Sequence, residues 1–238
     1  MPSSQHAKPE DAFKPVRADG QKARNGLLEA AVELFARLGF AKASTREIAR
    51  NAGVNIAAIR YYFGDKQGLY RAAYLEPMCK PEVAAAMLQR VKTLSLRQSL
   101  ELFYSEFLMP LKQGELVQQC MRLHFREMVE PTGLWAENLE HNIKPAQAAM
   151  ADVLCRHLGL PKPDDEVHRL NLALVGLALY YFVGRDVVQA TAPRLINTPA
   201  AVDKTIQRLC DLGEALVGAE KTRRIGSIQN GNNCGKQV

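Results

Sequence analysis

Apolar residues along this 238-residue chain recur every three or four positions, which is the spacing of one face of an α-helix. The alternation of apolar and polar residues that marks half-buried strands is nearly absent after residue 70. Glycine and proline divide the pattern into segments. The chain is therefore predicted to be all-α. The longer helices are expected at residues 21–38, 66–77, 81–94, 96–113, 115–130, 133–158, 164–190 and 199–218.

Residues Ser44–Lys66 predict two short helices joined by a tight turn. Ser44 and Glu47 have the spacing of a capping box, which would begin the first of these helices. Gly53 can supply the positive φ that a sharp turn requires, and Asn55 is a suitable cap for the second helix. Two helices joined in this way form a helix-turn-helix.

The second short helix has two unlike faces. Ile59 and Phe63 lie four residues apart and are expected to face the core. The other side carries Ile56, Ala57, Arg60 and Tyr61. A face of small, basic and aromatic side chains suits the major groove of DNA.

The segment Leu170–Val183 is apolar on nearly every side. It has 14 residues, contains Asn171 and is flanked by Arg169 and Arg185, so it is too short to span a membrane and indicates a buried helix. The helix at 199–218 carries an apolar stripe that is suited either to pairing with a second copy of the chain or to an ordinary intramolecular core. This stripe consists of Val202, Ile206, Leu209, Leu212, Leu216 and Val217.

Positive charge is concentrated at the two ends of the chain. The formal net charge is +6, with +4 in residues 1–70, −2 in residues 71–220 and +4 in residues 221–238. A basic N-terminal part suits contacts with phosphates, and a near-neutral remainder suits a partner or a small ligand. The alternative is a basic surface that only keeps the protein soluble.

Neither end of the chain has the pattern of a packed element. Residues 1–20 are polar and proline-containing, which predicts a flexible basic arm rather than a signal peptide; it could touch phosphates or a minor groove, or be a disordered tail. Residues 221–238 are predicted to be a disordered basic tail. The five cysteines are widely spread without a CxxC motif, which indicates reduced thiols and a cytoplasmic location.

The N-terminal quarter of the chain resembles the DNA-binding domain of TetR-type transcriptional regulators. Five elements of that pattern occur in order and at the right spacing. They are Leu38-Gly39-Phe40, Thr45 to Ala49, Ala52-Gly53-Val54, the helix Asn55 to Tyr62, and Phe63 to Leu69 with Lys66 inside it. The segment Arg122–Thr132 is similar to the CecR-like subgroup, regulators associated with antibiotic-responsive efflux operons, which favours a drug-like or aromatic effector.

The resemblance implies a fold and a domain organisation. The fold would be an N-terminal three-helix helix-turn-helix domain followed by a C-terminal helical domain for ligand binding and dimerisation. The implied segments are a flexible arm at 1–20, the DNA-binding domain at 21–65, the effector and dimerisation domain at 66–220 and a tail at 221–238. In this family the last two long helices pair across a two-fold axis, which here implies a homodimer through 164–190 and 199–218. Family habit indicates a repressor that binds a palindromic operator.

The resemblance also implies a set of DNA-contacting residues. They are Thr45, Arg46, Asn55, Ile56, Ala57, Ala58, Arg60, Tyr61, Tyr62 and Lys66. Arg60 and Ile56 stand where many relatives carry Tyr and Lys or Gln. Arg60 could read guanine and Ile56 or Ala57 could meet a thymine methyl, although a phosphate contact for Arg60 is an equal alternative. Lys66 is expected on a phosphate.

An effector pocket is expected between residues 100 and 141, where aromatic and methionine side chains occur with a few polar groups. The candidate ligand-binding residues are Phe103, Phe107, Met121, His124, Phe125, Met128, Trp135 and Asn138. The alternative is plain core packing, which would leave a ligand-independent or architectural DNA-binding protein.

No catalytic residues, cofactor or metal are assigned. His124 and Glu127 have i, i+3 spacing, but a single His-x-x-Glu without a second pair is usually structural. The sequence has no glycine-rich phosphate loop and no GxSxG motif, so it does not indicate an enzyme.

Overall fold

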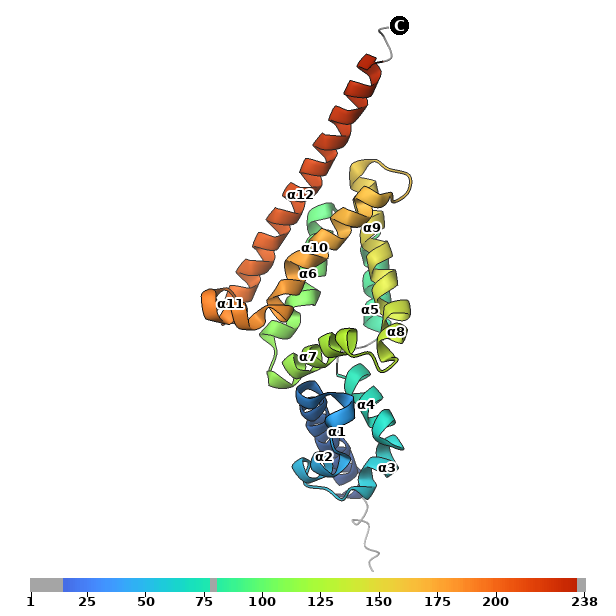
Figure 1. Ribbon diagram of the computed structural model, residues 1–238, viewed down its shortest axis with the longest axis vertical. Coiled ribbons are helices and arrows are strands. Elements are labelled where there is room, and N and C mark those ends of the chain that lie inside the picture. The colour runs from blue at the N-terminus through green and yellow to red at the C-terminus, as the bar shows by residue number, and fades with distance from the viewer. Residues whose placement is uncertain (1–14, 78–80, 235–238) are drawn as a thin grey trace, which may run out of the picture. The chain divides into compact units, whose positions relative to one another are not determined.

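The computed structural model describes the backbone of residues 15–77 and 81–234 and the side chains of residues 19–77 and 86–226. The regular elements in these ranges are all helical, so the predicted all-α fold is confirmed (Figure 1). The chain divides into two compact units, Met1–Pro77 and Met78–Val238. Residues 1–14 of the expected arm and 235–238 of the expected tail lie outside the described residues.

The N-terminal unit is built around its first helix. The four helices are α1 (Pro15–Lys42), α2 (Thr45–Asn51), α3 (Ala57–Phe63) and α4 (Lys66–Leu75). The other three helices all pack on α1. Phe35 of α1 is fully buried, and its ring meets Tyr70 of α4 edge-on at a centroid distance of 4.8 Å. These contacts make α4 part of the N-terminal unit, whereas the sequence predicted that the second domain begins at residue 66.

The first helix begins earlier than the sequence predicted. The helix α1 starts at Pro15, so residues 15–20 of the expected arm are helical. Proline fits the first turn of a helix because the missing N–H has no partner there. The regular helix is interrupted at Gly39, where φ is 77° and ψ is 170°.

The C-terminal unit contains eight α-helices within its described residues. They are α5 (Pro81–Arg90), α6 (Leu96–Lys112), α7 (Glu115–Val129), α8 (Leu134–Asn138), α9 (Lys144–Leu158), α10 (Asp165–Val183), α11 (Arg185–Thr191) and α12 (Pro199–Cys234). A π-helical turn at Leu139–Ile143 joins α8 to α9, and a 3-10 turn at Pro193–Leu195 precedes α12. The most extensive contact between two helices of this unit joins α6 and α12, which lie side by side (Figure 1).

One hydrophobic core joins α6, α9, α10 and α12. Leu100, Leu154, Leu174 and Val202 are completely buried in it. A hydrogen bond satisfies a polar group inside this core. The Tyr104 hydroxyl of α6 donates to the Leu174 carbonyl of α10 at 3.1 Å. A buried hydroxyl without such a partner would cost free energy.

Within one chain the helix α10 is buried on one side only, although its sequence is apolar on nearly every side. Leu170, Leu174 and Ala178 face the core, whereas Leu172 and Val183 are exposed. Within the described residues no helix is long and apolar enough on its own to span a membrane. The pair α10 and α11 would meet that test together by length and composition, but it is bent by 74°.

The helix α12 continues to Cys234, where the sequence predicted a disordered tail from residue 221. The guanidinium of Arg224 forms two hydrogen bonds of 2.8 Å with the Asp164 carboxylate, and it also donates to Glu220 at 2.6 Å. Its hydrogen bonds to Asp164 hold the pKa of that carboxyl well below its usual range. Asp164 also caps α10. Arg224, one of the basic residues that suggested a tail, thus holds α12 against the start of α10.

Candidate functional site

The helices α2 and α3 form the turn that the sequence predicted. Gly53 has a φ of 68°, a backbone conformation that is energetically unfavourable for residues with a Cβ. Val54 N–H donates to the Ala49 carbonyl at 3.0 Å, and the Asn55 side chain accepts from Ala57 N–H at 2.8 Å. Asn55 therefore caps α3, as expected from its residue type.

The predicted capping box at the start of α2 is wrong. The Ser44 side chain makes no capping hydrogen bond. The Glu47 carboxylate lies instead 3.7 Å from Arg37 of α1 and 3.9 Å from Arg50. These two arginines attract the carboxylate away from the Ser44 backbone N–H that a capping box would use.

A basic and aromatic face remains exposed on α2 and α3. Ile59 is buried, whereas the Tyr61 side chain is 82% exposed and Ile56 is 45% exposed. Arg46 and Arg60 are exposed and form no ion pair with any other described residue. Thr45, Ala58 and Tyr62 are half-buried, while Asn55 and Ala57 are exposed. Nine of the ten predicted DNA-contacting residues are thus at least partly exposed on α2, on α3 or in the two positions before α3.

Lys66 is the tenth residue and has partners inside the N-terminal unit. Its ammonium group lies 4.8 Å from the centroid of the Phe40 ring and donates to the Ala41 carbonyl at 3.3 Å. A cation over a ring face and a hydrogen bond to a carbonyl both stabilise this position. The structure therefore gives Lys66 a role in holding the end of α1 against the start of α4.

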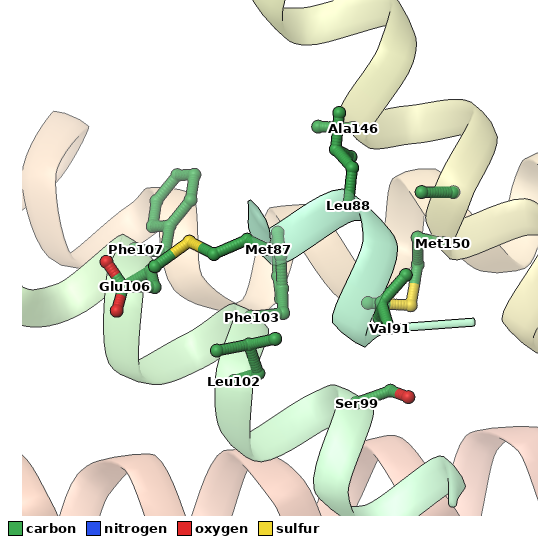
Figure 2. Close-up of a pocket in the computed structure, with 11 residues that line it drawn as sticks. Met87, Leu88, Val91, Ser99, Leu102, Phe103, Glu106, Phe107, Ala146 and Met150 are labelled. Atoms are coloured by element: carbon green, nitrogen blue, oxygen red, sulfur yellow. The ribbon is translucent and has the colours of Figure 1, made fainter. Parts of the chain in front are cut away.

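A pocket of about 330 Å³ lies between α5, α6 and α9 (Figure 2). Its walls are apolar apart from the Ser99 hydroxyl and the Glu106 carboxylate. The wall includes Met87 and Leu88 of α5, and Phe103 and Phe107 of α6. A cavity of this size and composition suits a small apolar or aromatic molecule.

The structure does not bring the eight predicted ligand-binding residues together in one cavity. Only Phe103 and Phe107 line the pocket of Figure 2, whereas Met121 and Phe125 line a second cavity of about 200 Å³. The other four are His124, Met128, Trp135 and Asn138, and they line neither of these cavities. The sequence thus placed in one pocket residues that line two different cavities in the structure.

His124 and Glu127 have structural roles. The His124 ring Nδ1 lies 2.9 Å from the Cys120 carbonyl of its own helix, and burial lowers the pKa of the imidazole. The buried Glu127 carboxylate accepts hydrogen bonds from the Thr132 N–H, at 2.7 Å, and from the Trp135 N–H, at 3.3 Å. Glu127 thus fixes the turn from α7 into α8. Among the described residues no group of three or more His, Cys, Asp or Glu could hold a metal ion.

Two family models match the chain, one in each unit. The model described as "Bacterial regulatory proteins, tetR family" matches residues 27–73, which contain the helix-turn-helix. The model described as "HTH-type transcriptional dual regulator CecR, C-terminal domain" matches residues 96–216, just over half of the chain. The protein belongs to the TetR family of transcriptional regulators. It is therefore a DNA-binding regulator and not an enzyme, and its C-terminal part is of the CecR type.

Individual proteins similar to this TetR-family chain support that assignment. The HTH-type transcriptional dual regulator CecR of Shigella flexneri is 27% identical over 179 residues, which cover 71% of this chain and 79% of the relative. The probable HTH-type transcriptional regulator YttP of Bacillus subtilis is 50% identical over 46 residues, covering 19% of this chain and 22% of that one.

Among solved structures, the fold is similar to NalD, the secondary repressor of the MexAB-OprM multidrug efflux pump in Pseudomonas aeruginosa. The TM-score is 0.58 with 22% sequence identity, over 83% of this chain and 97% of that one. At this identity the likeness shows the TetR-family fold alone.

Sequence reasoning missed the residues of α5 and α9 that line the pocket. Met87, Leu88, Ala146 and Ala149 form one side of it but lie outside the 100–141 region. The only signal of these residues in the sequence is their apolar spacing, which predicted helices. Which helix packs against α6 depends on contacts between distant segments, and one sequence does not contain that information.

Lys66→Ala is expected to loosen the N-terminal unit of this TetR-family protein rather than to remove a phosphate contact. Loss of the ring and carbonyl contacts should lower the stability at the α1–α4 junction by about 1–2 kcal/mol. Native-state hydrogen exchange of the α1 and α4 amides would measure this change. Lys42→Ala is the control, because Lys42 is an exposed lysine at the end of α1. A slope of log affinity against log salt that flattens by about one would instead indicate a phosphate contact.

Proposed function

We propose that this protein is a homodimeric repressor that binds a palindromic operator and is released by a small apolar or aromatic effector. The observation that carries the DNA-binding part is the exposed face of α3. There Arg60 has no ion-pair partner among the described residues, and Ile56 and Tyr61 remain exposed beside it. Groups of this kind on the second helix of a helix-turn-helix suit the major groove.

Arg60 and Ile56 are proposed as the residues that read sequence. An arginine can donate two hydrogen bonds to the O6 and N7 of guanine, and an apolar side chain can contact a thymine methyl. Arg46, Thr45, Tyr61 and Tyr62 are proposed to contact phosphates, which position the helix but carry no sequence information.

Dimerisation is proposed through exposed apolar side chains of α10 and α12. Leu172, Tyr180 and Val183 are exposed on α10, and Leu212 and Leu216, four residues apart, are exposed on α12. Exposed apolar stripes on two neighbouring helices suit burial against a second copy of the same pair. A dimer would present two recognition helices to half-sites about 34–36 Å apart, or at a multiple of that spacing.

The dimer stripe expected from the sequence needs a correction. Four of its members, Val202, Ile206, Leu209 and Val217, are at most 3% exposed and belong to the core of the same chain. Only Leu212 and Leu216 are exposed. The intramolecular alternative therefore holds for most of the stripe.

The pocket between α5, α6 and α9 is proposed to bind the effector. A filled C-terminal unit would favour a ligand-independent DNA-binding protein, whereas a cavity of about 330 Å³ favours a ligand-responsive one. An effector that binds one conformation of the dimer more tightly shifts the population towards it and so changes operator affinity.

Selection of bound fragments from the source genome would test the proposed function. The proposal expects a palindromic sequence, and a reporter placed behind it should be expressed less when the protein is present. A non-palindromic site bound by one chain would contradict the dimer, and lower reporter expression in the absence of the protein would contradict repression.

Filling the pocket should remove the response to effector without removing DNA binding. Ala149→Trp places a large ring in the cavity, and the expected result is loss of binding of the apolar dye N-phenyl-1-naphthylamine, measured by fluorescence. Operator affinity should change less than about twofold, since such a packing change stays in the C-terminal unit. Ala148→Trp is the matched control, because Ala148 is exposed on the same helix. Equal dye binding by both variants would place the effector elsewhere.

A further inference from the structure

A second cavity in the C-terminal unit is lined by charged and polar groups. It has a volume of about 200 Å³ and lies between α7 and the corner where α10 ends and α11 begins. Its apolar side consists of Met121, Phe125, Phe182 and Val183, and its polar side of Gln118, Arg122, Arg185 and Asp186. This lining differs from that of the almost wholly apolar pocket in Figure 2.

Two arginines from different helices meet at this cavity. Neither Arg122 of α7 nor Arg185 of α11 forms an ion pair or hydrogen bond through its side chain within the described part of the chain. Asp186 also lines the cavity, but its carboxylate lies beyond ion-pair distance of both guanidinium groups. Partial burial and the nearby charge of Arg122 lower the pKa of Arg185, and the Asp186 carboxylate offsets this only in part. A bound anion would relieve this repulsion.

The corner between α10 and α11 positions Arg185. The two helices are bent by 74° at Gly184. A Cβ on Gly184 would lie 2.6 Å from the ring of Tyr180, so a larger residue would have to displace that ring. Glycine therefore leaves room for the Tyr180 ring at this corner, and Arg185, the next residue, lines the same cavity as Arg122 of α7.

Two aromatic rings that contact each other also line this cavity. The Phe125 and Phe182 ring centroids are 5.7 Å apart with an interplanar angle of 38°, and Phe182 lies 5.8 Å from Phe107. Rings at these distances attract a further aromatic ring by stacking or edge contacts. A planar guanidinium donates two parallel hydrogen bonds to a carboxylate. The lining of the cavity therefore combines two guanidinium groups with two aromatic rings.

We propose that this cavity binds an aromatic carboxylate. The anionic group accepts hydrogen bonds from Arg122 and Arg185, and the ring packs against Phe125 and Phe182. The site is separate from the proposed effector pocket, although Phe182 contacts Phe107, which lines that pocket. Its ligand would link α7 to the α10–α11 corner.

Calorimetric titration of the full chain with 1-naphthoate tests the proposal. We expect the chain to bind 1-naphthoate. It should bind 1-naphthamide, which has the same ring but no charge, at least about tenfold more weakly. Arg122→Gln and Arg185→Gln should each weaken naphthoate binding about tenfold or more. Arg169→Gln is the matched control, since Arg169 is an exposed arginine of α10 that pairs with Glu166. It should leave naphthoate affinity unchanged.

Independent variants keep the two sites distinguishable. Ala149→Trp should retain naphthoate binding, and both arginine variants should retain binding of N-phenyl-1-naphthylamine in the other pocket. If Arg185→Gln lost its helical circular dichroism, Arg122→Gln would decide the question, because Arg122 is exposed. Absence of naphthoate binding, equal affinity for the amide, or equal affinity of Arg122→Gln and the original chain would each overturn the proposal.

Discussion

Arg60→Ala is expected to weaken operator binding by about 1–3 kcal/mol, or roughly 5- to 150-fold, while binding to random DNA weakens much less. The reason is that a bidentate contact to guanine is lost only where the correct base is present. Arg60 is exposed on α3 and its side chain has no ion pair or hydrogen bond among the described residues, so the substitution breaks no such contact there. Competition binding with operators randomised at each position would show relaxed preference at one base pair per half-site.

A charge-matched control separates base reading from general attraction. Arg50→Ala also removes one positive charge from the N-terminal unit, but Arg50 lies on α2 and is paired with Glu47 at 3.9 Å. Its effect should be similar on operator and random DNA. If Arg60→Ala weakened both DNAs to the same extent, Arg60 would be a phosphate contact, which is the alternative that the sequence left open.

The helix-turn-helix could be predicted from the sequence because its determinants are local. Gly53 acts through its backbone conformation, and Asn55 through a hydrogen bond to a residue two positions away. The neighbouring residues in the sequence were therefore sufficient to predict the turn. The capping box predicted from Ser44 and Glu47 is absent because Arg37, which lies on another helix, attracts the Glu47 carboxylate. The partners of Lys66 could not be predicted for the same reason, since Phe40 and Ala41 come from α1.

The C-terminal unit was less predictable, since its features depend on which helices meet. Apolar spacing in 199–218 identified a helix with an inner stripe, but it did not separate Leu209, which is in the core, from Leu212, which is exposed. The basic residues after 220 suggested a tail, yet Arg224 pairs with Asp164, 60 positions away. The effector pocket likewise needs α5 and α9 beside α6. Such contacts are visible only in the folded chain.

The double substitution Leu212→Asp with Leu216→Asp is expected to produce a folded monomer that loses operator binding. Both side chains are exposed in the single chain, at 37% and 38%, so the charges remain hydrated before association. In the proposed dimer each charge would be buried without a partner, at a cost of about 3–5 kcal/mol. The dimer dissociation constant should rise by at least about a hundredfold. Sedimentation velocity would measure the oligomeric state.

Two comparison variants distinguish loss of the dimer interface from loss of the fold. Val129→Asp is the matched control, because Val129 is 81% exposed on α7, outside α10 and α12, and should leave both the dimer and operator affinity intact. Leu209→Asp, which the sequence pattern placed at the interface, should instead unfold the C-terminal unit, since Leu209 is 3% exposed within one chain. If the Leu212 and Leu216 variant remained a dimer, the proposed interface on α12 would be wrong. Because a monomer presents one recognition helix, its operator affinity should fall towards that for a single half-site.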